Sequence, residues 1–379
     1  MQKYQRILSL KEICASKSAF LLGPRQTGKS HLIREELSGV RVIDLLKSEI
    51  FLEFQRAPQK LRQVIPLKDN LIVIDEIQRV PELLNEVHLL IEEKGILFLL
   101  TGSSARKLRR SGVNLLGGRA RNYYLHPLTS SELGSDFDLN QVLHYGSLPS
   151  VINSDEPRLD LNAYVENYLQ LEISAEALTR NIPAFSRFLE ISALCNGAIL
   201  NYTKIANDAQ IAPSTVQEYF QILRDTLMGF DLPAWKESKK RKASRTSKFY
   251  FFDIGVVNAI LGRWEIREKS TQYGENLESW IFHELRSYTD YYRLKPLSYW
   301  RSQQQDEVDF ILDGTIAIEV KAASRISKSD LRGLRKLRQE LEHSRFLLVC
   351  PCSMRQEQEG IEIWPVEEFL GALWGRELL

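Results

Sequence analysis

The strongest constraint on this chain is a short glycine-containing segment near its start, Gly23-Pro-Arg-Gln-Thr-Gly28-Lys29-Ser30. It matches the pattern G-x-x-x-x-G-K-[ST], follows the apolar run 19–22 and precedes a stretch with helical periodicity. In this pattern the glycines let backbone N–H groups wrap around phosphates, and the start of the following helix favours anions. The segment therefore predicts a buried strand, a phosphate-binding loop and a helix, in that order.

We predict that this loop binds ATP together with Mg²⁺. Lys29 is expected to reach the β- and γ-phosphates, and the Ser30 hydroxyl is expected to bind the magnesium ion. The predicted nucleotide-contacting residues are Gly23, Pro24, Arg25, Gln26, Thr27, Gly28, Lys29, Ser30 and His31.

A second apolar run, 71–74, ends in two consecutive carboxylates, Asp75 and Glu76. Two acids after a strand also occur in solvated turns, but beside a phosphate loop they have defined roles. Asp75 is expected to hold Mg²⁺, and Glu76 is expected to activate the attacking water. The pattern thus predicts ATP hydrolysis as well as ATP binding.

Two further catalytic candidates follow the third apolar run, 96–100. The hydroxyl groups after this run can orient the water or touch the γ-phosphate, with Ser103 as first choice and Thr101 as second. A capped helix start would explain the same residues. Arg119 or Arg121 can reach the γ-phosphate of a neighbouring subunit, which would imply a homo-oligomer. The alternative interpretation is that both are ordinary surface arginines.

The middle of the chain is predicted to form a helix-turn-helix, with Ser214 as N-cap of a second helix over 215–227. A hairpin with strands near 229–233 and 248–252 would complete a winged helix. A basic run on this hairpin suits the phosphates of DNA, although it also suits a solvated loop, and winged helices also bind proteins. The run consists of Lys236, Lys239, Lys240, Arg241, Lys242, Arg245 and Lys248, with Glu237 as its one acid.

The last third of the chain places acids at spacings typical of a phosphodiesterase site. Asp309 lies in one apolar strand segment, and the neighbouring segment contains Glu319-Val-Lys321, whose charged residues share one face. Asp309 and Glu319 can share a divalent cation, and Lys321 can orient or deprotonate the attacking water. Glu278, from the helix predicted over 275–291, can complete the metal ligands. A fold that has lost the metal and binds DNA or a partner is the alternative.

These features predict an α/β protein in four parts. Buried strand segments alternate with helices over 1–128, which predicts an ATPase core with a parallel sheet. Residues 129–190 are predicted to form a helical lid or linker, 191–262 the winged helix and 263–379 the nuclease-like α/β domain.

The order of these motifs resembles a family of bacterial and archaeal AAA+-related ATPases with a winged helix and a C-terminal restriction-endonuclease-like domain. The resemblance covers nearly the whole chain and rests on the phosphate loop, Ile-Asp-Glu-Ile-Gln, Leu-Thr-Gly-Ser-Ser, Glu-Val-Asp-Phe and Ile-Glu-Val-Lys. It implies ATP and Mg²⁺ binding by the residues named above. It also implies that the C-terminal domain is similar to PD-(D/E)xK nucleases, although here no proline precedes Asp309.

We therefore expect an ATP-dependent DNA-processing ATPase, in which Lys239, Lys240, Arg241 and Lys242 contact phosphates and the C-terminal domain binds or cuts DNA. The alternative is a nucleotide-switched regulatory or defence protein that binds a protein partner through an inert nuclease-like fold. The net charge of +1 gives no global attraction to nucleic acid, so local patches must supply it. No apolar run approaches the ~20 residues of a membrane span, and no signal pattern is present, so a cytoplasmic location is expected.

Overall fold

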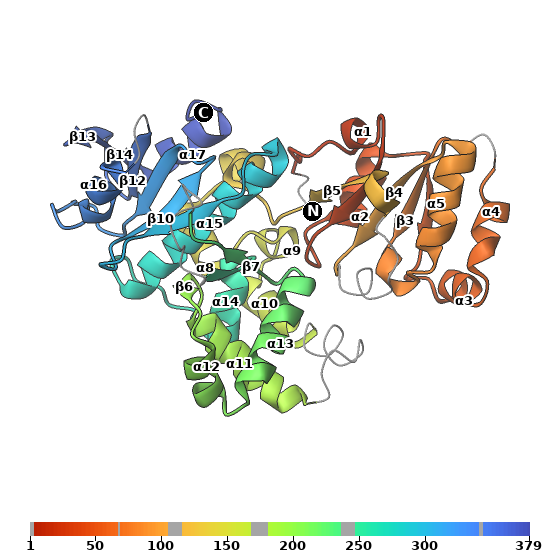
Figure 1. Cartoon of the computed structure of the whole chain (residues 1–379), viewed down its shortest axis with the longest axis horizontal. Coiled ribbons are helices and arrows are strands. Elements are labelled where there is room, and N and C mark those ends of the chain that lie inside the picture. Colours follow the sequence, from red (N-terminus) through yellow and green to blue (C-terminus); the bar gives the residue numbers. More distant parts are fainter. Residues whose placement is uncertain (1–3, 67–68, 105–115, 168–180, 236–246, 341–343) are drawn as a thin grey trace. The chain divides into compact units, whose positions relative to one another are not determined.

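The computed structural model describes residues 4–66, 69–104, 116–167, 181–235, 247–340 and 344–379 (Figure 1). They form two compact units. The N-terminal unit comprises residues 3–127 with 225–228, and the C-terminal unit comprises residues 128–224 and 229–379. Of the helices in the described ranges, none is both long enough and apolar enough to cross a membrane.

The N-terminal unit is built on a five-stranded sheet in the order β2-β3-β4-β1-β5, in which every neighbouring pair is parallel. The apolar runs found in the sequence are its central strands, and they are buried because helices cover the sheet. This confirms the predicted parallel α/β core. Its strands are β1 (Ser18–Leu22), β2 (Arg41–Asp44), β3 (Leu71–Asp75), β4 (Leu97–Gly102) and β5 (Ala120–Tyr124). Its helices are α1 (Leu10–Ile13), α2 (Lys29–Glu36), α3 (Ser48–Arg56), α4 (Leu61–Val64) and α5 (Leu83–Lys94), with short 3₁₀ turns η1 (Pro58–Lys60), η2 (Ile77–Arg79) and η3 (Leu116–Gly118).

The first part of the C-terminal unit is mainly helical and includes a small antiparallel sheet in the order β6-β8-β7. The predicted hairpin is confirmed, since Gly229 pairs with Phe251 and Leu232 with Lys248. The second helix of the predicted helix-turn-helix begins two residues earlier than expected: Ser214 lies inside it, because Pro213 can occupy the first helical position, where no N–H bond is needed. The helices are α7 (Ser130–Leu133), η4 (Gly134–Asp136), α8 (Leu139–Tyr145), α9 (Pro149–Ile152), α10 (Pro157–Asn167), α11 (Ile182–Leu194), α12 (Tyr202–Ala209), α13 (Pro213–Asp225) and α14 (Ile254–Leu261), and the strands are β6 (Ala198–Ile199), β7 (Gly229–Leu232) and β8 (Lys248–Phe251).

Strand β8 packs on both faces because its side chains alternate between two partners. On one face Phe249 lies 4.9 Å from Phe220 of α13, between ring centroids, and so belongs to the helical core. On the other face Tyr250 stacks on Phe282 with centroids 4.1 Å apart. Phe282 lies on α15 (Thr271–Tyr292), which begins the last part of the chain. The helical part and the last part are thus joined through β8.

The last part of the C-terminal unit contains a six-stranded mixed sheet in the order β13-β14-β12-β11-β10-β9. The predicted helix and strands over 275–320 and the strand at 345–349 are confirmed, whereas the charged helix predicted over 328–342 covers only 332–338. Trp300, Val308, Leu334 and Leu348 contribute to the core between sheet and helix. The elements after α15 are β9 (Ser298–Arg301), β10 (Glu307–Leu312), β11 (Ile316–Val320), α16 (Arg332–Arg338), β12 (Arg345–Cys350), β13 (Gln356–Gln358), β14 (Ile361–Pro365) and α17 (Val366–Trp374).

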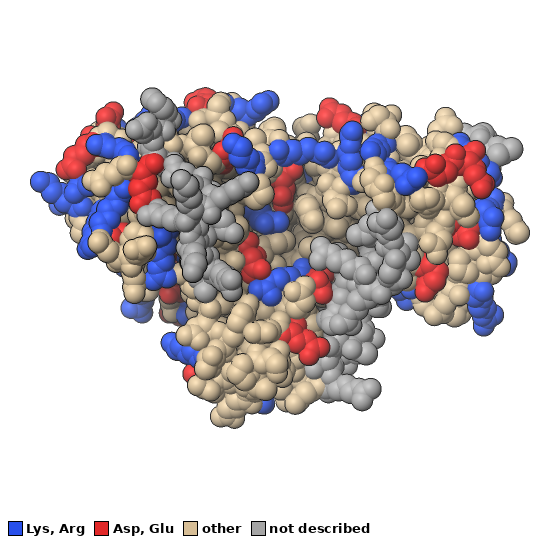
Figure 2. All heavy atoms as spheres, in the orientation of Figure 1, with Lys and Arg blue, Asp and Glu red and all other residues tan. Residues whose placement is uncertain are grey.

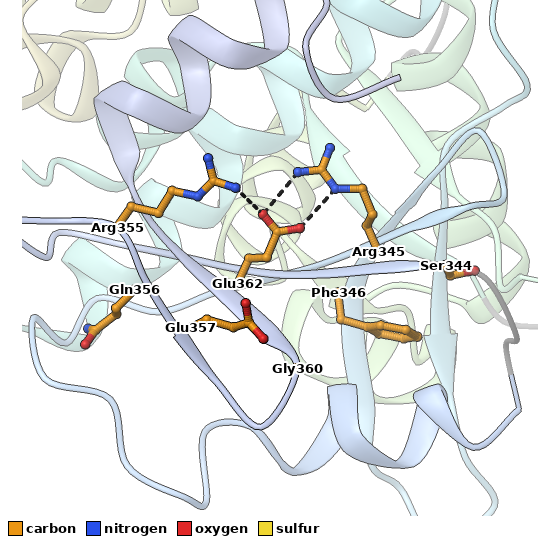
Figure 3. Close-up of a pocket in the computed structure, with 8 residues that line it drawn as sticks. All are labelled: Ser344, Arg345, Phe346, Arg355, Gln356, Glu357, Gly360 and Glu362. Carbon is orange, nitrogen blue, oxygen red and sulfur yellow. Dashed lines mark hydrogen bonds and ion pairs between the residues drawn. The ribbon is translucent and has the colours of Figure 1, made fainter.

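In a pocket at the β13 end of this sheet, two arginines pair with one glutamate (Figure 3). Arg345 donates to both oxygens of Glu362, at 3.0 and 3.1 Å, and Arg355 donates to the same carboxylate at 2.5 Å. Partial burial opposes ionisation of Glu362, but these two arginines hold its pKa below the usual value. One carboxylate thus engages both arginines of the pocket.

Buried Asp253 is the N-cap of α14 and also connects this helix to the segment after α8. Its carboxylate accepts from Val256 N at 3.1 Å and from Ser147 N at 2.8 Å. The neighbouring Gly146 has φ +68°, and a Cβ there would lie 2.0 Å from Asp253 Oδ1. Only a glycine therefore permits this approach.

We predict that Asp253→Ala lowers the free energy of unfolding of the C-terminal unit by roughly 2–4 kcal/mol, because it leaves buried N–H groups unsatisfied. Asp138→Ala is the matched control, since Asp138 caps α8 through Gln141 N at 2.9 Å but is exposed. That variant should cost about 1 kcal/mol. Urea unfolding followed by circular dichroism measures both, and equal losses would contradict the role given to burial.

Candidate functional site

The loop between β1 and α2 is shaped by its two glycines. Gly28 caps α2 with φ 94°, in the left-handed region that favours glycine. A Cβ on Gly23 would lie 2.4 Å from the carbonyl oxygen of Leu125, so no other residue fits there without a shift. Thr27 Oγ1 donates to the carbonyl of Pro24 at 2.9 Å and closes the turn. The backbone thus has the form of a phosphate cradle at the N-terminus of a helix.

Lys29, the first residue of α2, is buried, with 6% of its surface exposed. Its ammonium donates to the carbonyl oxygens of Gly23 and Pro24 at 2.7 and 2.9 Å. The charge is therefore held directly at the loop, where it complements phosphates.

The predicted magnesium ligands meet at the edge where β1, β3 and β4 end. Ser30 Oγ donates to Asp75 Oδ2 at 3.0 Å, joining the start of α2 to the end of β3. Thr101 Oγ1 donates to the other oxygen of Asp75 and accepts from Glu76 N at 3.0 Å. A hydroxyl and a carboxylate side by side, with phosphate and water oxygens completing the shell, are what Mg²⁺ prefers at a nucleotide. These residues fit Mg²⁺ and ATP.

The catalytic candidate Glu76 is held by two side chains. Its backbone has φ 60°, and its carboxylate accepts from Ser103 Oγ at 3.3 Å and, at close range, from Gln78 Nε2. Gln78 also donates to Ser103 Oγ at 3.2 Å, and a Cβ on Gly102 would lie 2.6 Å from Gln78 Oε1. Glu76, Gln78 and Ser103 therefore form a packed group beside the loop.

Sequence reasoning missed Gln78 as a site residue. It belongs to the segment Ile-Asp-Glu-Ile-Gln, which we used only for the resemblance. In a continued strand its side chain would share the face of Glu76 but lie roughly 7 Å further along. Instead, β3 ends at Asp75 and the turn η2 brings the amide against the Glu76 carboxylate. The left-handed Glu76 is the cause of that return.

The structure places the remaining candidates of this unit in other contacts. Arg119 Nε pairs with Glu92 of α5, and Arg121 is exposed on β5. His31 Nε2 lies 3.7 Å from Glu35 on the same helix. The proposed action of an arginine on a neighbouring subunit stays a prediction.

In the C-terminal unit, the predicted acids Glu278, Asp309 and Glu319 meet, together with Glu307, which sequence reasoning did not single out, in a carboxylate cluster. Lys248 of β8 lies among them: its Nζ is 3.2 Å from Glu278 Oε1, 2.6 Å from Glu307 Oε1 and 3.4 Å from Asp309 Oδ1. Lys321 pairs with Glu319. The sequence placed Lys248 in the basic hairpin, but its side chain is only 4% exposed and does not belong to a phosphate-binding surface.

The electrostatics of the cluster follow from burial and from neighbouring charges. Burial, and then Asp309, raise the pKa of Glu319 to about 8, although Lys321 opposes the shift. For Lys248 burial alone would lower the pKa, but Tyr250 and the carboxylates around it raise it overall, so its ammonium form is favoured.

The predicted metal ligands of this cluster do not fit a divalent cation as they are arranged. Glu278 and Asp309 direct oxygens at an ammonium, which occupies the side where a metal would bind. Within the described ranges, no group of three or more His, Cys, Asp or Glu residues is placed to hold a metal ion. We therefore derive no metal-dependent step here.

Residues 15–134 match a family model described as an AAA domain. Residues 136–265 match a domain of unknown function (DUF8612), and residues 273–369 match another (DUF4143). The chain thus carries an AAA-type P-loop ATPase domain followed by two domains whose family descriptions give no function. The first match agrees with the loop and strand-end geometry described above.

Two related bacterial proteins are described as uncharacterized. One from Mycobacterium tuberculosis is 24% identical over 345 residues, covering 87% of this chain and 76% of that protein. One from Haemophilus influenzae is 24% identical over 295 residues, covering 69% and 72%. These relatives therefore supply no activity that could be compared with this site.

Solved structures show only weak likeness. A Signal Transduction ATPase with Numerous Domains from Pyrococcus horikoshii has a TM-score of 0.26 at 12% identity and covers 75% of this chain and 47% of that chain. This chain thus spans about half the length of that structure. The Bacillus subtilis DNA clamp loader delta protein has a TM-score of 0.23 at 13% identity, covering 54% and 83%. Likenesses of this size carry no conclusion about function.

We predict that Gln78→Ala lowers kcat for ATP hydrolysis about tenfold and leaves KM nearly unchanged, because the amide positions Glu76 without contacting the nucleotide. Steady-state phosphate release measures both constants. Gln55→Ala, an exposed glutamine on α3 of the same unit, is the control and should behave like the unsubstituted protein. A rise in KM with unchanged kcat would instead make Gln78 a binding residue.

Proposed function

We propose that the chain hydrolyses ATP with Mg²⁺ in its N-terminal unit. The observation that carries this proposal is the hydrogen bond between Ser30 and Asp75, 3.0 Å long, with Glu76 next along the chain. It joins the phosphate loop to the strand-end acids in the arrangement that Mg²⁺-dependent cleavage of a phosphoanhydride requires.

Each residue then has a chemical role. Ser30 and Asp75 would hold Mg²⁺, which when bound would neutralise charge on the β- and γ-phosphates. The Lys29 ammonium exchanges its hydrogen bonds with the carbonyls of Gly23 and Pro24 for bonds to the phosphates. The ammonium moves only a short distance, because these carbonyls belong to the loop that binds the phosphates. Glu76 accepts a proton from the attacking water, and the oxygen of this water forms a bond to the γ-phosphorus. At the same time the bond between the γ-phosphorus and the bridging oxygen breaks. The products are ADP and phosphate. Ser103 and Gln78 hold the Glu76 carboxylate during this step.

We predict that Glu76→Gln retains ATP binding and lowers kcat at least about a hundredfold, since an amide cannot accept the proton. Lys29→Ala is the contrasting variant: it should lose hydrolysis and bind ATP much more weakly, because the loop loses its buried cation. Fluorescent-nucleotide titration and single-turnover hydrolysis separate the two effects. Loss of ATP binding in Glu76→Gln would show that Glu76 supports the fold of the loop and is not the base.

A second proposal concerns DNA as the partner, and α12 and α13 support it. Asn201 caps α12, Gln210 ends it in the left-handed conformation, and α13 follows after a short turn, as in a helix-turn-helix. Phe220 of α13 is buried, with its centroid 4.9 Å from that of Phe188 of α11. We therefore propose that this part of the chain is a winged helix.

The outer face of α13 presents polar side chains of the kind that contact bases and phosphates. Ser214 and Gln217 are exposed, whereas Val216 on the opposite side is fully buried. Figure 2 shows basic and acidic side chains interspersed over one face of the molecule, so attraction to DNA must come from a local segment. The basic segment, of which residues 236–246 lie outside the described ranges, is the candidate that the sequence supplies.

We predict that replacing Lys239, Lys240, Arg241 and Lys242 by Ala flattens the slope of log affinity for duplex DNA against log salt by roughly three to four units, about 0.9 for each phosphate contact. Affinity should fall equally for different sequences, because phosphate contacts do not read bases, and ATP affinity should stay the same. Fluorescence anisotropy over a salt series measures this. An unchanged slope in a folded variant would remove the segment from the DNA surface, and absence of any DNA binding would favour a protein partner.

A further inference from the structure

The position of Lys248 carries an inference that is independent of ATP hydrolysis. We infer that its ammonium is the resident cation of the carboxylate cluster, and that it excludes a divalent metal ion from this site. The last part of the chain would then not act as a metal-dependent nuclease. Its acids instead bind a lysine of the preceding domain.

The ammonium is fixed in place by the packing of its strand. Alternation along β8 directs Lys248 and Tyr250 to the same side, toward α15 and β10. Tyr250 donates its hydroxyl to Glu278 Oε1 at 2.5 Å, the oxygen that also accepts from Lys248. The stacked contact of Tyr250 with Phe282 holds the strand against the helix. Lys248 therefore reaches the cluster from a rigid backbone.

The oxygens that would bind a metal already have partners. Asp309 Oδ2 accepts from Val320 N at 2.9 Å, and its Oδ1 faces Lys248. One oxygen of Glu319 accepts from Lys321, and Glu319 Oε2, in a side chain nine-tenths buried, is a fully buried oxygen without a hydrogen-bond partner in the described ranges. Two ammonium groups and one backbone N–H thus already engage an oxygen of every acid in the cluster, whereas Mg²⁺ requires a near-octahedral set of oxygens.

Removing the ammonium should convert the cluster into a cation site. Glu278, Glu307 and Asp309 converge on a single point from α15 and β10, so their oxygens would surround whatever replaces Lys248 Nζ. The unpartnered oxygen of Glu319 belongs to the same cluster. Without a cation, these carboxylates would repel one another in a poorly solvated site.

Lys248→Met tests the inference, because it keeps most of the side-chain length and removes the charge. Mn²⁺ is the probe, and its free concentration is followed by electron paramagnetic resonance in the absence of nucleotide. Lys336→Met is the matched control: Lys336 also pairs with a carboxylate of this domain, Asp306, but outside the cluster. Lys248→Met combined with Asp309→Asn tests whether any gained site uses the cluster.

We expect the unsubstituted protein and Lys336→Met to bind no Mn²⁺ in the micromolar range, Lys248→Met to gain one site, and the double variant to lose it. Stoichiometric binding by the unsubstituted protein that Asp309→Asn removes would overturn the inference. So would Lys248→Met without a gained site.

A thermal measurement keeps the inference testable if Lys248→Met folds poorly. Loss of a buried charge partner should lower Tm by roughly 10 °C, and Mn²⁺ should restore a large part of this loss where sodium chloride of equal ionic strength does not. The Tm of the unsubstituted protein should not change with Mn²⁺. Equal responses of both proteins to Mn²⁺ would contradict exclusion of the metal by Lys248.

Discussion

The hydrogen bond between Ser30 and Asp75 can form because the sheet of the N-terminal unit is parallel. Strands β1 and β3 both pair with β4, so their carboxyl ends open on the same edge. The phosphate loop follows one strand and the paired acids follow the other. Parallel strands that are covered on both faces place their loops at one edge, so the grouping of the proposed ATP-site residues follows from the strand order.

The arrangement of the phosphate loop and the strand-end acids could be predicted from the sequence because their positions are local in the chain, while their roles in binding and hydrolysing ATP stay predictions. Gly23, Lys29 and Ser30 are specified by a single loop, and Asp75 is specified by the end of an apolar strand. Gln78 could not be predicted in the same way. Gln78 contacts Ser103, which lies 25 residues away in the sequence. The contact also depends on a left-handed backbone at Glu76, which a glutamate in the sequence does not predict.

The carboxylate cluster shows a different limit of sequence reasoning. Strand segments and periodicity correctly located Asp309 and Glu319, but a lysine at the end of a basic run reads as exposed. The sequence Lys-Phe-Tyr-Phe places Lys248 and Tyr250 on one face and two phenylalanines on the other, which is the pattern of a half-exposed strand. The structure buries both faces, and a buried lysine requires carboxylate partners. The sequence pattern indicates the acids Asp309 and Glu319, but it does not indicate that Lys248 neutralises the cluster.

The alternation of side chains along β8 limits the shifts that this strand can make. A shift of one residue would exchange Lys248 and Tyr250 with the phenylalanines of the helical core, which places charge among aromatic rings. A shift of two would bring Tyr250 to the place of Lys248 and leave the acids without a cation. Both slips are therefore unfavourable, so a single register of β8 sets how the helical part packs against the last part of the chain.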